Sequence, residues 1–500
     1  MAIKRYLKSS LYFIFGFLCI IAFIIASILN WKWLFNLNSF YWLYFIFFTI
    51  FLFSGIYFVI EGIYFTKAAH NNKCIDSFLY NKIITIFLII MVIGGFLFYF
   101  SYLNNKQGDH GPYLSWKGDT ATTMTITWDT QCAEPDPVFK WGEKEFEVTQ
   151  IATVTGTEHH HTVTLTELKP DSTYYYQIPG FLDKITSFRT GPNIGSQEPF
   201  TFLLYGDTRE DNPSESELDH EELIELMEEE KDARFVLQAG DIANDYADNW
   251  KEQWDYNFHV ISPISKHIPY MTVAGNHDWW KEGSIPESGQ TYVNFYELPD
   301  NGPNGDKTSY YFSYANVFIL VIGYDYQDAA SPENYDEDHV KWVKDQLNDA
   351  KSSDLFDWII VMHHKPAFSL KITSGEDETG EPENRYWHPI FMELGVDFVL
   401  SGHNHHYERI PMGFTSEDIG THNITYIISG AGGGGGELHD TAITTFDSQL
   451  EPVGDLEYYG KTAFAEKEFH YVRFYVEGTK LILTTIDIEG TVIDTFTYIK

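Results

Sequence analysis

The chain has 500 residues, 44% of them hydrophobic and 17% aromatic, and a formal net charge of −38. A chain of this length exceeds what one hydrophobic core usually holds, so several domains are expected. Residues 1–105 contain seven Lys/Arg and two Asp/Glu, which leaves 26 basic and 69 acidic residues, a net charge of −43, in the rest. So acidic a surface disfavours nucleic acid and anionic lipid as partners, and we expect no nucleic acid partner.

The first 105 residues hold three apolar runs that are nearly free of charge: 11–29, 40–60 and 83–102. Each run has about 20 residues, enough for a helix to cross the hydrocarbon core of a bilayer. A cleaved signal peptide would account for only one run, and the length and low charge of the runs disfavour buried helices of a soluble domain. We therefore predict a membrane domain, residues 1–105, whose three transmembrane helices contact lipid and act as an anchor.

Basic residues around these runs predict the topology, because they concentrate on the cytoplasmic side. Three precede the first run, one lies in the first loop and three lie in the second: Lys4, Arg5, Lys8, Lys32, Lys67, Lys73 and Lys82. The N-terminus is therefore expected in the cytoplasm, and the chain after Tyr102 outside the cell membrane. The sequon at Asn423 is compatible with that location. Cys132 is the one cysteine after the runs, so no intramolecular disulfide framework is expected there.

Residues 106–195 read as a small β-sandwich of short alternating strands separated by turns. Three of the expected strands are 124–128, 161–165 and 173–178. The turn and aromatic strand over 168–176 resemble those of a fibronectin type III domain. Three consecutive histidines, 159–161, are a candidate metal-binding tract, but neighbours in a strand point to opposite faces, so a structural role is the preferred interpretation.

After the linker 191–199, residues 196–500 alternate apolar runs with helical segments, which indicates an α/β domain. Ser214 and Glu217 offer a capping box for a helix that follows the strand at 200–205. Its core-facing side chains are expected to be Leu218, Leu223, Ile224 and Met227. A polar stretch, 369–384, is a candidate loop over the site, and 432–436 is a glycine run; flexible surface loops are the alternative for both.

Five strand-like runs in this domain each end in a polar cluster. The runs are 200–205, 235–238, 270–273, 358–362 and 396–400. In the same order, the clusters contain Asp207 and Arg209; Asp241; Asn276, His277 and Asp278; His363 and His364; and His403, Asn404 and His405. Because ligands bind at the carboxyl ends of strands in open α/β sheets, we expect the clusters to converge at one sheet edge.

The side chains in these clusters have the chemistry of a binuclear metal site. Two carboxylates, one amide oxygen and three imidazoles suit two divalent ions about 3.5–4 Å apart, provided that one carboxylate bridges them. Any one cluster is weak evidence, since Gly-Asp is a common turn and paired histidines are often surface residues. Five clusters in corresponding positions make a metallohydrolase the preferred interpretation.

The segment 402–409, Gly-His-Asn-His-His-Tyr-Glu-Arg, matches the Gly-His-x-His-x-Tyr-Glu-Arg of purple acid phosphatases. The chain from about residue 110 thus resembles this group of calcineurin-like metallophosphoesterases. The resemblance implies a four-layer β-sandwich catalytic domain behind the smaller sandwich. It also implies a first metal on Asp207 and His405, a second on Asn276, His364 and His403, and Asp241 as the bridge. His364 is preferred to His363 because His364-Lys365-Pro366 fits the family's His-x-Pro.

The sequence departs from the family at two positions. Asn244 stands where purple acid phosphatases have the tyrosine whose metal-bound form gives them their colour. A ferric ion is therefore not expected, and two divalent ions of Fe, Mn or Zn are; Tyr246 could replace the tyrosine only if the loop were rearranged. Arg209 stands where the wider family has glycine or histidine, and either pairs with a substrate phosphate or forms a salt bridge with nearby acidic residues.

The resemblance implies hydrolysis of phosphate esters, with His277 as the general acid that protonates the leaving oxygen. We expect a membrane-anchored phosphomonoesterase of the acid phosphatase type. A phosphodiesterase or nucleotide hydrolase is the alternative, and a catalytically idle binding or adhesion protein is the alternative of another class. The roles of His363, His388 and His406, the pH optimum and the oligomeric state stay open at this point.

Overall fold

The computed structural model describes residues 109–209, 217–244, 250–278, 290–305, 307–323, 337–369, 372–373, 376–377, 386–410, 415–416, 420–421, 423–434, 464–466 and 468–500. The chain divides into two compact units, Met1–Lys106 and Gln107–Lys500, and every described residue belongs to the second. The three predicted membrane spans lie outside the described residues. Among the residues described, no helix is long and apolar enough to span a bilayer.

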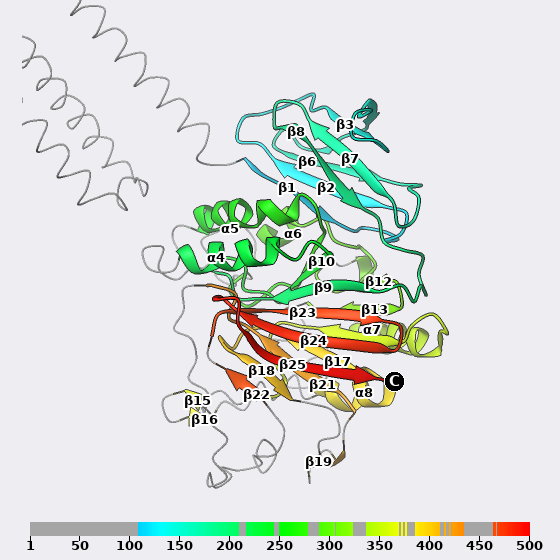
Figure 1. Ribbon diagram of the computed structural model, residues 1–500, viewed down its shortest axis with the longest axis vertical. Helices are drawn as coiled ribbons and strands as arrows, with labels where there is room; N and C mark the ends of the chain where they lie inside the picture. The colour runs from blue at the N-terminus through cyan, green and yellow to red at the C-terminus, as the bar shows by residue number, and fades with distance from the viewer. Residues whose placement is uncertain are drawn as a thin grey trace, which may run out of the picture. The chain divides into compact units, whose positions relative to one another are not determined.

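The N-terminal part of the described unit is a sandwich of two four-stranded antiparallel sheets (Figure 1). One sheet has the order β1 (His110–Ser115), β2 (Met124–Asp129), β6 (His160–Leu165) and β5 (Thr155–Gly156), and the other β4 (Gln150–Ala152), β3 (Phe139–Gly142), β7 (Thr173–Ile178) and β8 (Leu182–Arg189). Buried and accessible side chains alternate along β7, as a strand with one face in the core requires. The three strands expected from the sequence are present to within one residue.

The histidine tract follows this alternation. His161 is buried and forms a hydrogen bond of 2.9 Å with Thr130 Oγ1. On the other face of the strand, His160 Nδ1 lies 2.8 Å from Asp129 Oδ1, and its Nε2 lies 3.8 Å from Glu297 Oε1. Within the described ranges, neither residue belongs to a group of three or more potential metal ligands. This geometry agrees with the structural interpretation of the tract.

The rest of the unit is built on two larger sheets. The first has the order β11 (Tyr270–Thr272), β10 (Ala233–Gln238), β9 (Phe200–Tyr205), β23 (His470–Glu477), β24 (Lys480–Asp487) and β25 (Val492–Ile499). The second has the order β12 (Tyr310–Tyr314), β13 (Val317–Val321), β14 (Trp358–Met362), β17 (Phe398–Ser401), β21 (Thr425–Ser429), β18 (Tyr407–Ile410) and β22 (Phe464–Glu466). The short pairs β15 (Ile372–Thr373) with β16 (Glu376–Asp377) and β19 (Thr415–Ser416) with β20 (Gly420–Thr421) lie outside both sheets.

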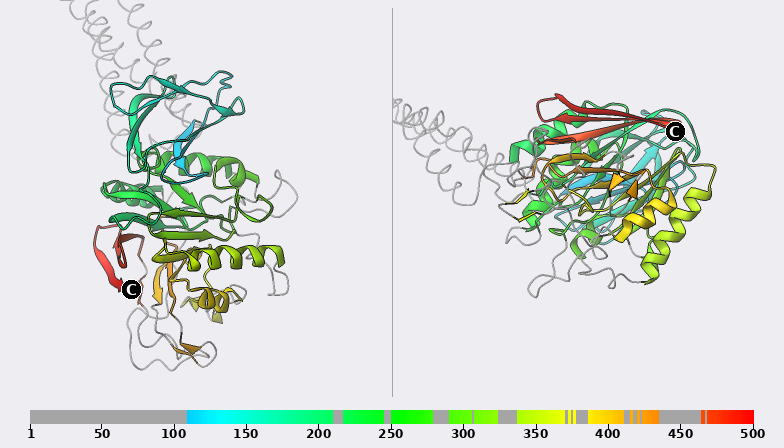
Figure 2. Two further views of the ribbon diagram at one scale, coloured as in Figure 1. Left: turned by 90° about the vertical axis from the view of Figure 1, so that its right-hand side faces the viewer. Right: turned by 90° about the horizontal axis from the view of Figure 1, so that it is seen from below.

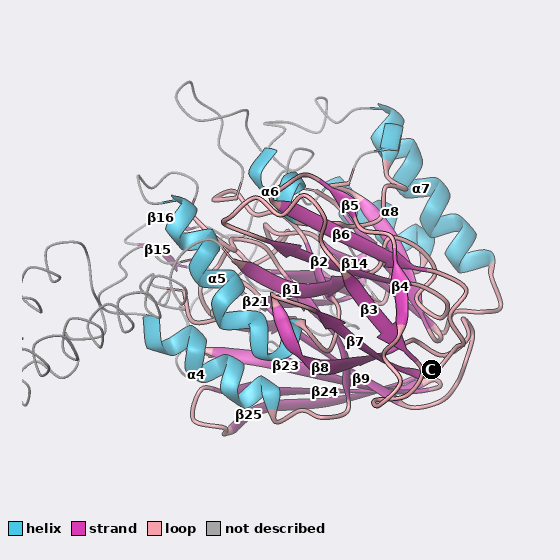
Figure 3. Ribbon diagram, turned by 90° about the horizontal axis from the view of Figure 1, so that it is seen from above, coloured by secondary structure: helices cyan, strands magenta, loops and turns pink. Residues whose placement is uncertain are grey.

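Helices flank the two sheets on opposite sides (Figures 2 and 3). The helices are α4 (Glu217–Glu228), α5 (Trp250–Ser265) and α6 (Gln290–Phe295) on one side, and α7 (Glu337–Ser352) and α8 (Trp387–Leu394) on the other, with the 3₁₀ turn η1 (Pro303–Gly305) near α7. Of the side chains predicted to face the core from α4, Leu223, Ile224 and Met227 are buried. The Leu218 side chain and Ser214 lie outside the described part.

Aromatic side chains fill the space between the sheets. Phe202 on β9 stacks on Phe474 with ring centroids 4.6 Å apart, and Phe398 on β17 meets Phe474 edge-on at 6.1 Å. Tyr498 on β25 also meets Phe398 at 4.8 Å. The two sheets therefore bury their facing sides against each other, and the architecture is helix, sheet, sheet, helix.

The expectation of a single sheet edge was wrong. Strands β9, β10 and β11 are parallel neighbours in the first sheet, whereas β14 and β17 are parallel neighbours in the second. An apolar run followed by a polar cluster has the same pattern in either sheet, so the sequence does not distinguish one sheet from two. The polar clusters therefore meet where the carboxyl ends of strands from two packed sheets face each other.

The smaller sandwich and the larger domain built on the two sheets share one hydrophobic core. Hydrogen bonds also cross between them: the Tyr113 hydroxyl donates to the carbonyl oxygen of Phe295, and Tyr176 donates to that of Lys266 at 2.8 Å. Lys117 Nζ forms a salt bridge of 2.6 Å with Glu297 Oε2, and His160 lies near the other oxygen of this carboxylate. Burial acts to raise the pKa of Glu297, but these cationic partners lower it to about 2.

The contact of His160 with Asp129 and Glu297 predicts that the stability of the folded protein depends on pH. Burial acts to lower the pKa of His160, but Asp129 and Glu297 outweigh it and raise the pKa from 6.5 to about 9. The folded state holds this proton more tightly than the unfolded chain, so the contribution is complete below pH 6.5 and is lost as the pH rises through about 9. In residues 106–500 we expect His160→Gln to lower Tm by a few degrees at pH 6, and by much less at pH 9.5. Scanning calorimetry at both pH values measures this, with exposed His159→Gln as control; equal losses at both pH values would contradict the assignment.

Candidate metal centre

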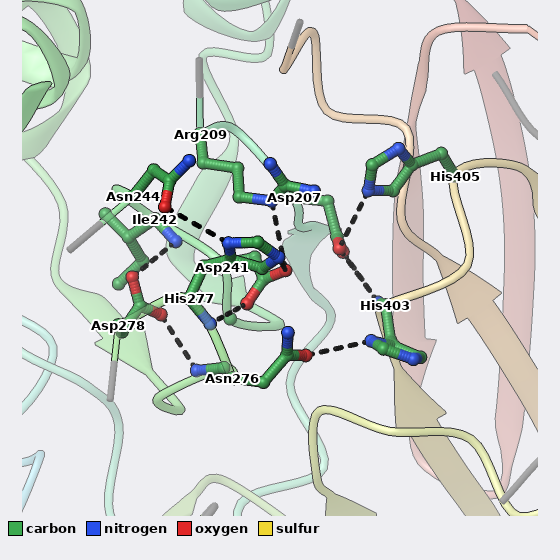
Figure 4. A network of polar contacts seen from close by, with 12 residues as sticks. Asp207, Arg209, Asp241, Ile242, Asn244, Asn276, His277, Asp278, His403 and His405 are labelled. Atoms are coloured by element: carbon green, nitrogen blue, oxygen red, sulfur yellow. Dashed lines mark hydrogen bonds and ion pairs between the residues drawn. The ribbon is translucent and has the colours of Figure 1, made fainter. Parts of the chain in front are cut away.

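The six predicted ligands lie on loops that follow five strands of the two sheets. Asp207, Asp241 and Asn276 come from the ends of β9, β10 and β11, whereas His364 follows β14 and His403 and His405 follow β17. Because the strands in each set are parallel, their carboxyl ends lie at the same edge. Figure 4 shows the side chains from the two sheets directed toward one another.

Three of these ligands have a strained backbone. Asp207, Asp241 and His403 have φ values of 59°, 52° and 68°, in the left-handed region that non-glycine residues rarely adopt. They make up half of the six non-glycine residues with positive φ in the described part of the chain. Each such conformation costs about 1–3 kcal/mol and persists where the surroundings enforce it, as they often do at functional sites. Here the Asp207 amide donates to the Gly240 carbonyl at 2.8 Å, which ties two ligand loops together.

The site also requires close approach of the backbone at Gly402. A Cβ atom at this position would lie 2.3 Å from Asp207 Oδ2 and 2.8 Å from the Ala239 carbonyl oxygen. No side chain fits there without displacing the Asp207 carboxylate. The glycine that precedes His403 in the motif is thus explained by packing against the other sheet's ligand loop.

The centre of the cluster is Asp241. Its Oδ1 lies 3.2 Å from His364 Nε2, and one ligand atom each of Asp241, His364 and His403 lie within 4.8 Å of one another. Asn276 Oδ1 lies 3.1 Å from His364 Nε2 and 2.9 Å from His403 Nδ1. The structure therefore brings together the three residues assigned to the second metal and the assigned bridge.

Asp207 and His405 form the adjacent, looser pair. His405 Nε2 lies 3.6 Å from Asp207 Oδ1, and the Asp207 carboxylate also accepts the backbone N–H of His403 at 2.8 and 3.0 Å. Both side chains are at least nine-tenths buried. This pair has the residue types and the position expected for the first metal.

The donor set fits cations. His364 Nδ1 lies 2.7 Å from the Ala239 carbonyl oxygen and must donate a proton to it. In the neutral ring, Nε2 then carries a lone pair that faces two acceptors, Asp241 Oδ1 and Asn276 Oδ1. Three lone-pair donors directed at one point repel one another unless a proton or a cation lies between them. Carboxylate, amide and imidazole donors together suit Mn, Zn or Fe(II).

The buried carboxylates of Asp207 and Asp241 also require a positively charged partner. Burial raises the pKa of Asp207 well above its usual value, against the opposing effect of His364. Burial acts in the same direction on Asp241, but His364 outweighs it and holds the pKa of Asp241 well below its usual value. His364 itself has its pKa raised to about 9, because Asp241 and Asp207 outweigh the effect of burial. A divalent ion bound here would replace this proton as the partner of the carboxylates.

Arg209 and His277 lie beside Asp241. Arg209 Nε is 3.3 Å from Asp241 Oδ2, and His277 Nε2 is 4.0 Å from the same oxygen. The backbone N–H of His277 donates to Asp241 Oδ1 at 2.9 Å. The structure therefore shows Arg209 in a salt bridge with an acidic residue, one of the two roles expected from the sequence. The partner is Asp241, the residue assigned to bridge the two metals.

The other three histidines considered from the sequence are buried and bonded elsewhere. His363 lies 3.4 Å from Ser401 Oγ, and burial lowers its pKa to about 4. His388 Nδ1 lies 2.5 Å from the Tyr426 hydroxyl. His406 Nε2 lies 3.1 Å from Glu408 Oε2. We assign none of these three rings to the group of six ligands.

His406 belongs to a network of hydrogen bonds that holds the loop of His403 and His405 in place. Ser369 Oγ donates to Glu408 Oε2 at 3.2 Å, and the Asn404 amide donates to Ser369 Oγ at 2.6 Å. Asn404 lies between His403 and His405 in the chain, so this buried chain of hydrogen bonds fixes the loop that carries both ligands. The side chains are at most 3% exposed.

Asp278 connects two of the ligand loops, a role that the sequence did not reveal. Its Oδ1 accepts the N–H groups of Ile242 and Ala243 at 2.8 and 2.9 Å, and its Oδ2 accepts that of Gly275 at 2.8 Å. The fully buried carboxylate therefore ties the loop of Asp241 to the loop of Asn276. The only indication in the sequence was its position two residues after Asn276, because a carboxylate so close to a metal ligand needs hydrogen-bond donors of its own.

The glycine run is not a flexible surface loop over its described part, Gly432–Gly434. Gly432 N donates to the Gly206 carbonyl at 2.8 Å, and Gly434 N to the Asp207 carbonyl at 3.1 Å. Gly433 has φ +94°, and a Cβ there would lie 2.4 Å from the His220 backbone nitrogen. The run supports the Asp207 loop, and only residues without a side chain fit so close. Gly435 and Gly436, like most of 369–384, lie outside the described residues.

Comparison with known proteins agrees with this architecture. Residues 200–407 match the family described as calcineurin-like phosphoesterase, and residues 110–202 match the purple acid phosphatase N-terminal domain. A solved purple acid phosphatase, PPD1 from yellow lupin (Lupinus luteus) seeds, superposes with a TM-score of 0.59 at 20% sequence identity, over 77% of this chain and 73% of its own. At that identity the superposition shows the shared fold.

Two curated relatives come from Arabidopsis thaliana. Purple acid phosphatase 18 is 28% identical over 313 residues, which are 59% of this chain and 65% of that protein. Fe(3+)-Zn(2+) purple acid phosphatase 12 is 27% identical over 261 residues, 50% of this chain and 52% of that protein. The matches thus span between about half and two thirds of the relatives' length.

Proposed function

We propose that this chain, which carries a calcineurin-like phosphoesterase domain behind a purple acid phosphatase N-terminal domain, is a metal-dependent phosphoester hydrolase. The observation that carries the proposal is the convergence of ligand atoms from two sheets around Asp241. A binding protein with an idle domain would be expected to lack some of the ligands, and all six are present.

The residues would divide between two ions as the family resemblance implies. Asp207 and His405 would hold the first, Asn276, His364 and His403 the second, and Asp241 would bridge them. The ions, when bound, supply a hydroxide near neutral pH and polarise the phosphoryl oxygens for in-line attack. Because Asn244 occupies the tyrosine position, we propose two divalent ions of Mn, Zn or Fe rather than a ferric centre.

Two side chains would act on the substrate directly. As the bond between phosphorus and the leaving oxygen breaks and the new phosphorus–oxygen bond forms, His277 Nε2 would give its proton to the leaving oxygen. Arg209 would turn part of its hydrogen-bonding capacity from Asp241 to a phosphate oxygen, for which its planar guanidinium is suited. His277 is 25% exposed and Arg209 10%, so the histidine is the more accessible of the two.

A phosphate monoester is the proposed substrate class, and a diester or nucleotide is the alternative because the same ions serve both. We expect residues 106–500, after chelation and reloading with Mn, Zn or Fe, to hydrolyse an aryl phosphate monoester faster than the corresponding diester. His403→Ala is expected to abolish turnover, whereas exposed His159→Ala on the small sandwich keeps it. A higher rate on the diester would select the alternative, and a folded protein without turnover in any metal would reject the hydrolase.

We further propose that the chain is anchored in the cell membrane with its catalytic domain outside. The support is the three apolar runs before residue 105 and the distribution of lysine and arginine around them. Cys132 is exposed, and Cys74 lies in the predicted inner loop. A membrane-impermeant maleimide added to intact cells should therefore label the wild type and Cys74→Ser but not Cys132→Ser. Labelling of Cys132→Ser before lysis would contradict this topology.

A further inference from the structure

The first of the two large sheets ends at strand β25, which pairs with β24 on one side and with no other strand among the described residues (Figures 1 and 2). At the end of β25, the N–H of Lys500 donates to the carbonyl oxygen of Thr479, just before β24. Alternate residues of an antiparallel strand direct their backbone N–H and C=O groups to the same side. The residues whose groups point away from β24 are therefore Thr495, Thr497 and Ile499.

Strand β25 lacks the features that usually prevent an exposed sheet edge from pairing with another chain. Such edges commonly carry charged side chains or prolines. Strand β8, an edge of the small sandwich with the same eight-residue length, has three charged side chains: Asp183, Lys184 and Arg189. Strand β25 contains no proline and one charged residue, Asp494. This carboxylate is 9% exposed and accepts hydrogen bonds from Arg409 at 2.6 and 3.0 Å, so it does not protect the edge.

The same strand exposes large apolar side chains. Val492, Phe496 and Ile499 are 54%, 39% and 76% exposed. A long edge strand with unpaired backbone groups and exposed apolar side chains is a site at which a further strand can add.

The distribution of charge favours a second copy of this chain as the source of that strand. Residues 470–500 contain three Lys/Arg and four Asp/Glu, which leaves −42 of the net charge of −43 on residues 106–469. Two copies therefore repel each other least where the strands β24 and β25 of both meet.

The charges at the two ends of β25 favour an antiparallel arrangement. The strand is followed by Lys500, which is 40% exposed and also pairs with Asp397, and the turn before it carries exposed Glu489. Antiparallel pairing brings the basic end of each strand beside the acidic turn of the other, whereas parallel pairing would bring like charges together.

We propose that two copies of this chain pair antiparallel along β25, across a two-fold axis, so that their six-stranded sheets form one continuous sheet. The outward backbone groups of Thr495, Thr497 and Ile499 then bond to the same strand of the second copy. The exposed apolar side chains of the strand become covered in the same step. The proposal does not depend on the hydrolytic function, because β25 carries none of the six assigned metal ligands.

The test is the protein mass of the full-length chain in detergent micelles, measured by light scattering during size-exclusion chromatography. For an interface of this small size we expect the mass of two chains at roughly 100 µM protein. Thr497→Pro is expected to have the mass of one chain, because proline removes an outward N–H and no bond to β24. Wild type with the mass of one chain, or folded Thr497→Pro with the mass of two, would overturn the proposal.

A matched pair of glutamate variants decides the question if circular dichroism shows that Thr497→Pro does not fold. Ile499→Glu is expected to raise the Kd of the dimer at least about tenfold, since each copy adds a charge to the paired edge. Ile151→Glu on the small sandwich replaces a side chain that is 72% exposed, similar to the 76% of Ile499, and is expected to leave the Kd unchanged. Equal effects of the two substitutions would overturn the proposal.

Amide hydrogen exchange reports on β25 directly. In peptides that cover residues 491–500 of the wild type, we expect slower exchange at roughly 100 µM than at roughly 1 µM protein, because the outward amides are protected only in the dimer. In Thr497→Pro the exchange is expected to be equally fast at both concentrations. A wild-type dimer in which these peptides exchange equally fast at both concentrations would place the interface elsewhere and overturn the proposal.

Discussion

Asp241→Asn is expected to lower kcat by roughly a thousandfold or more and to leave fewer than two metal ions per chain. The carboxylate contacts three partners at once: His364 Nε2 at 3.2 Å, the His277 amide at 2.9 Å and Arg209 Nε at 3.3 Å. An amide has one acceptor oxygen and no charge, so it cannot bridge two cations and still balance these groups. Elemental analysis of the purified protein and kcat on an aryl phosphate measure the two effects.

The control for this substitution is Asp232→Asn. Asp232 pairs with Arg473 at 3.0 Å and has a largely exposed side chain, and it is not part of the ligand group. We expect it to keep both metal content and kcat. Two ions per chain and unchanged kcat in Asp241→Asn would show that Asp241 is not the bridge.

Asp278→Ala is expected to destabilise the larger domain by at least about 3 kcal/mol, because three N–H groups lose their acceptor in a fully buried place. It is also expected to weaken zinc affinity by about 10- to 100-fold, since the loops that present Asp241 and Asn276 lose their connection. Urea unfolding of the metal-free protein measures the first effect, and zinc titration with a competing chelator measures the second.

Asp278→Asn serves as the graded variant. Its amide keeps one oxygen but turns an NH₂ group toward at least one of the three donors, so we expect a loss between those of wild type and Asp278→Ala. Stability within about 0.5 kcal/mol of wild type in Asp278→Ala would mean that water replaces the carboxylate and that the connection between the loops is unimportant.

The strands of the larger domain were largely determined by the local sequence. Strands β9 and β14 have the predicted bounds, and β10 begins at Ala233, two residues before the predicted start. Strands buried on both faces read as continuous apolar runs, so their length is visible without knowledge of their neighbours. The strand β17 begins two residues later than expected, at Phe398, because Asp397 uses its carboxylate to accept the Ile359 amide.

The types of the candidate ligands were also visible in the sequence, because each follows a strand directly and only certain side chains bind metal ions. The separation of these ligands into two sheets was not visible in the sequence, because it depends on pairings between strands that are far apart in the chain. One example is β9 with β23, in which Thr201 pairs with Tyr475. For the same reason, the partners of Asp278 and the support that Gly432–Gly434 give to Asp207 were decided only by the tertiary structure. A local pattern specifies which groups a loop presents, whereas long-range packing specifies which loops meet.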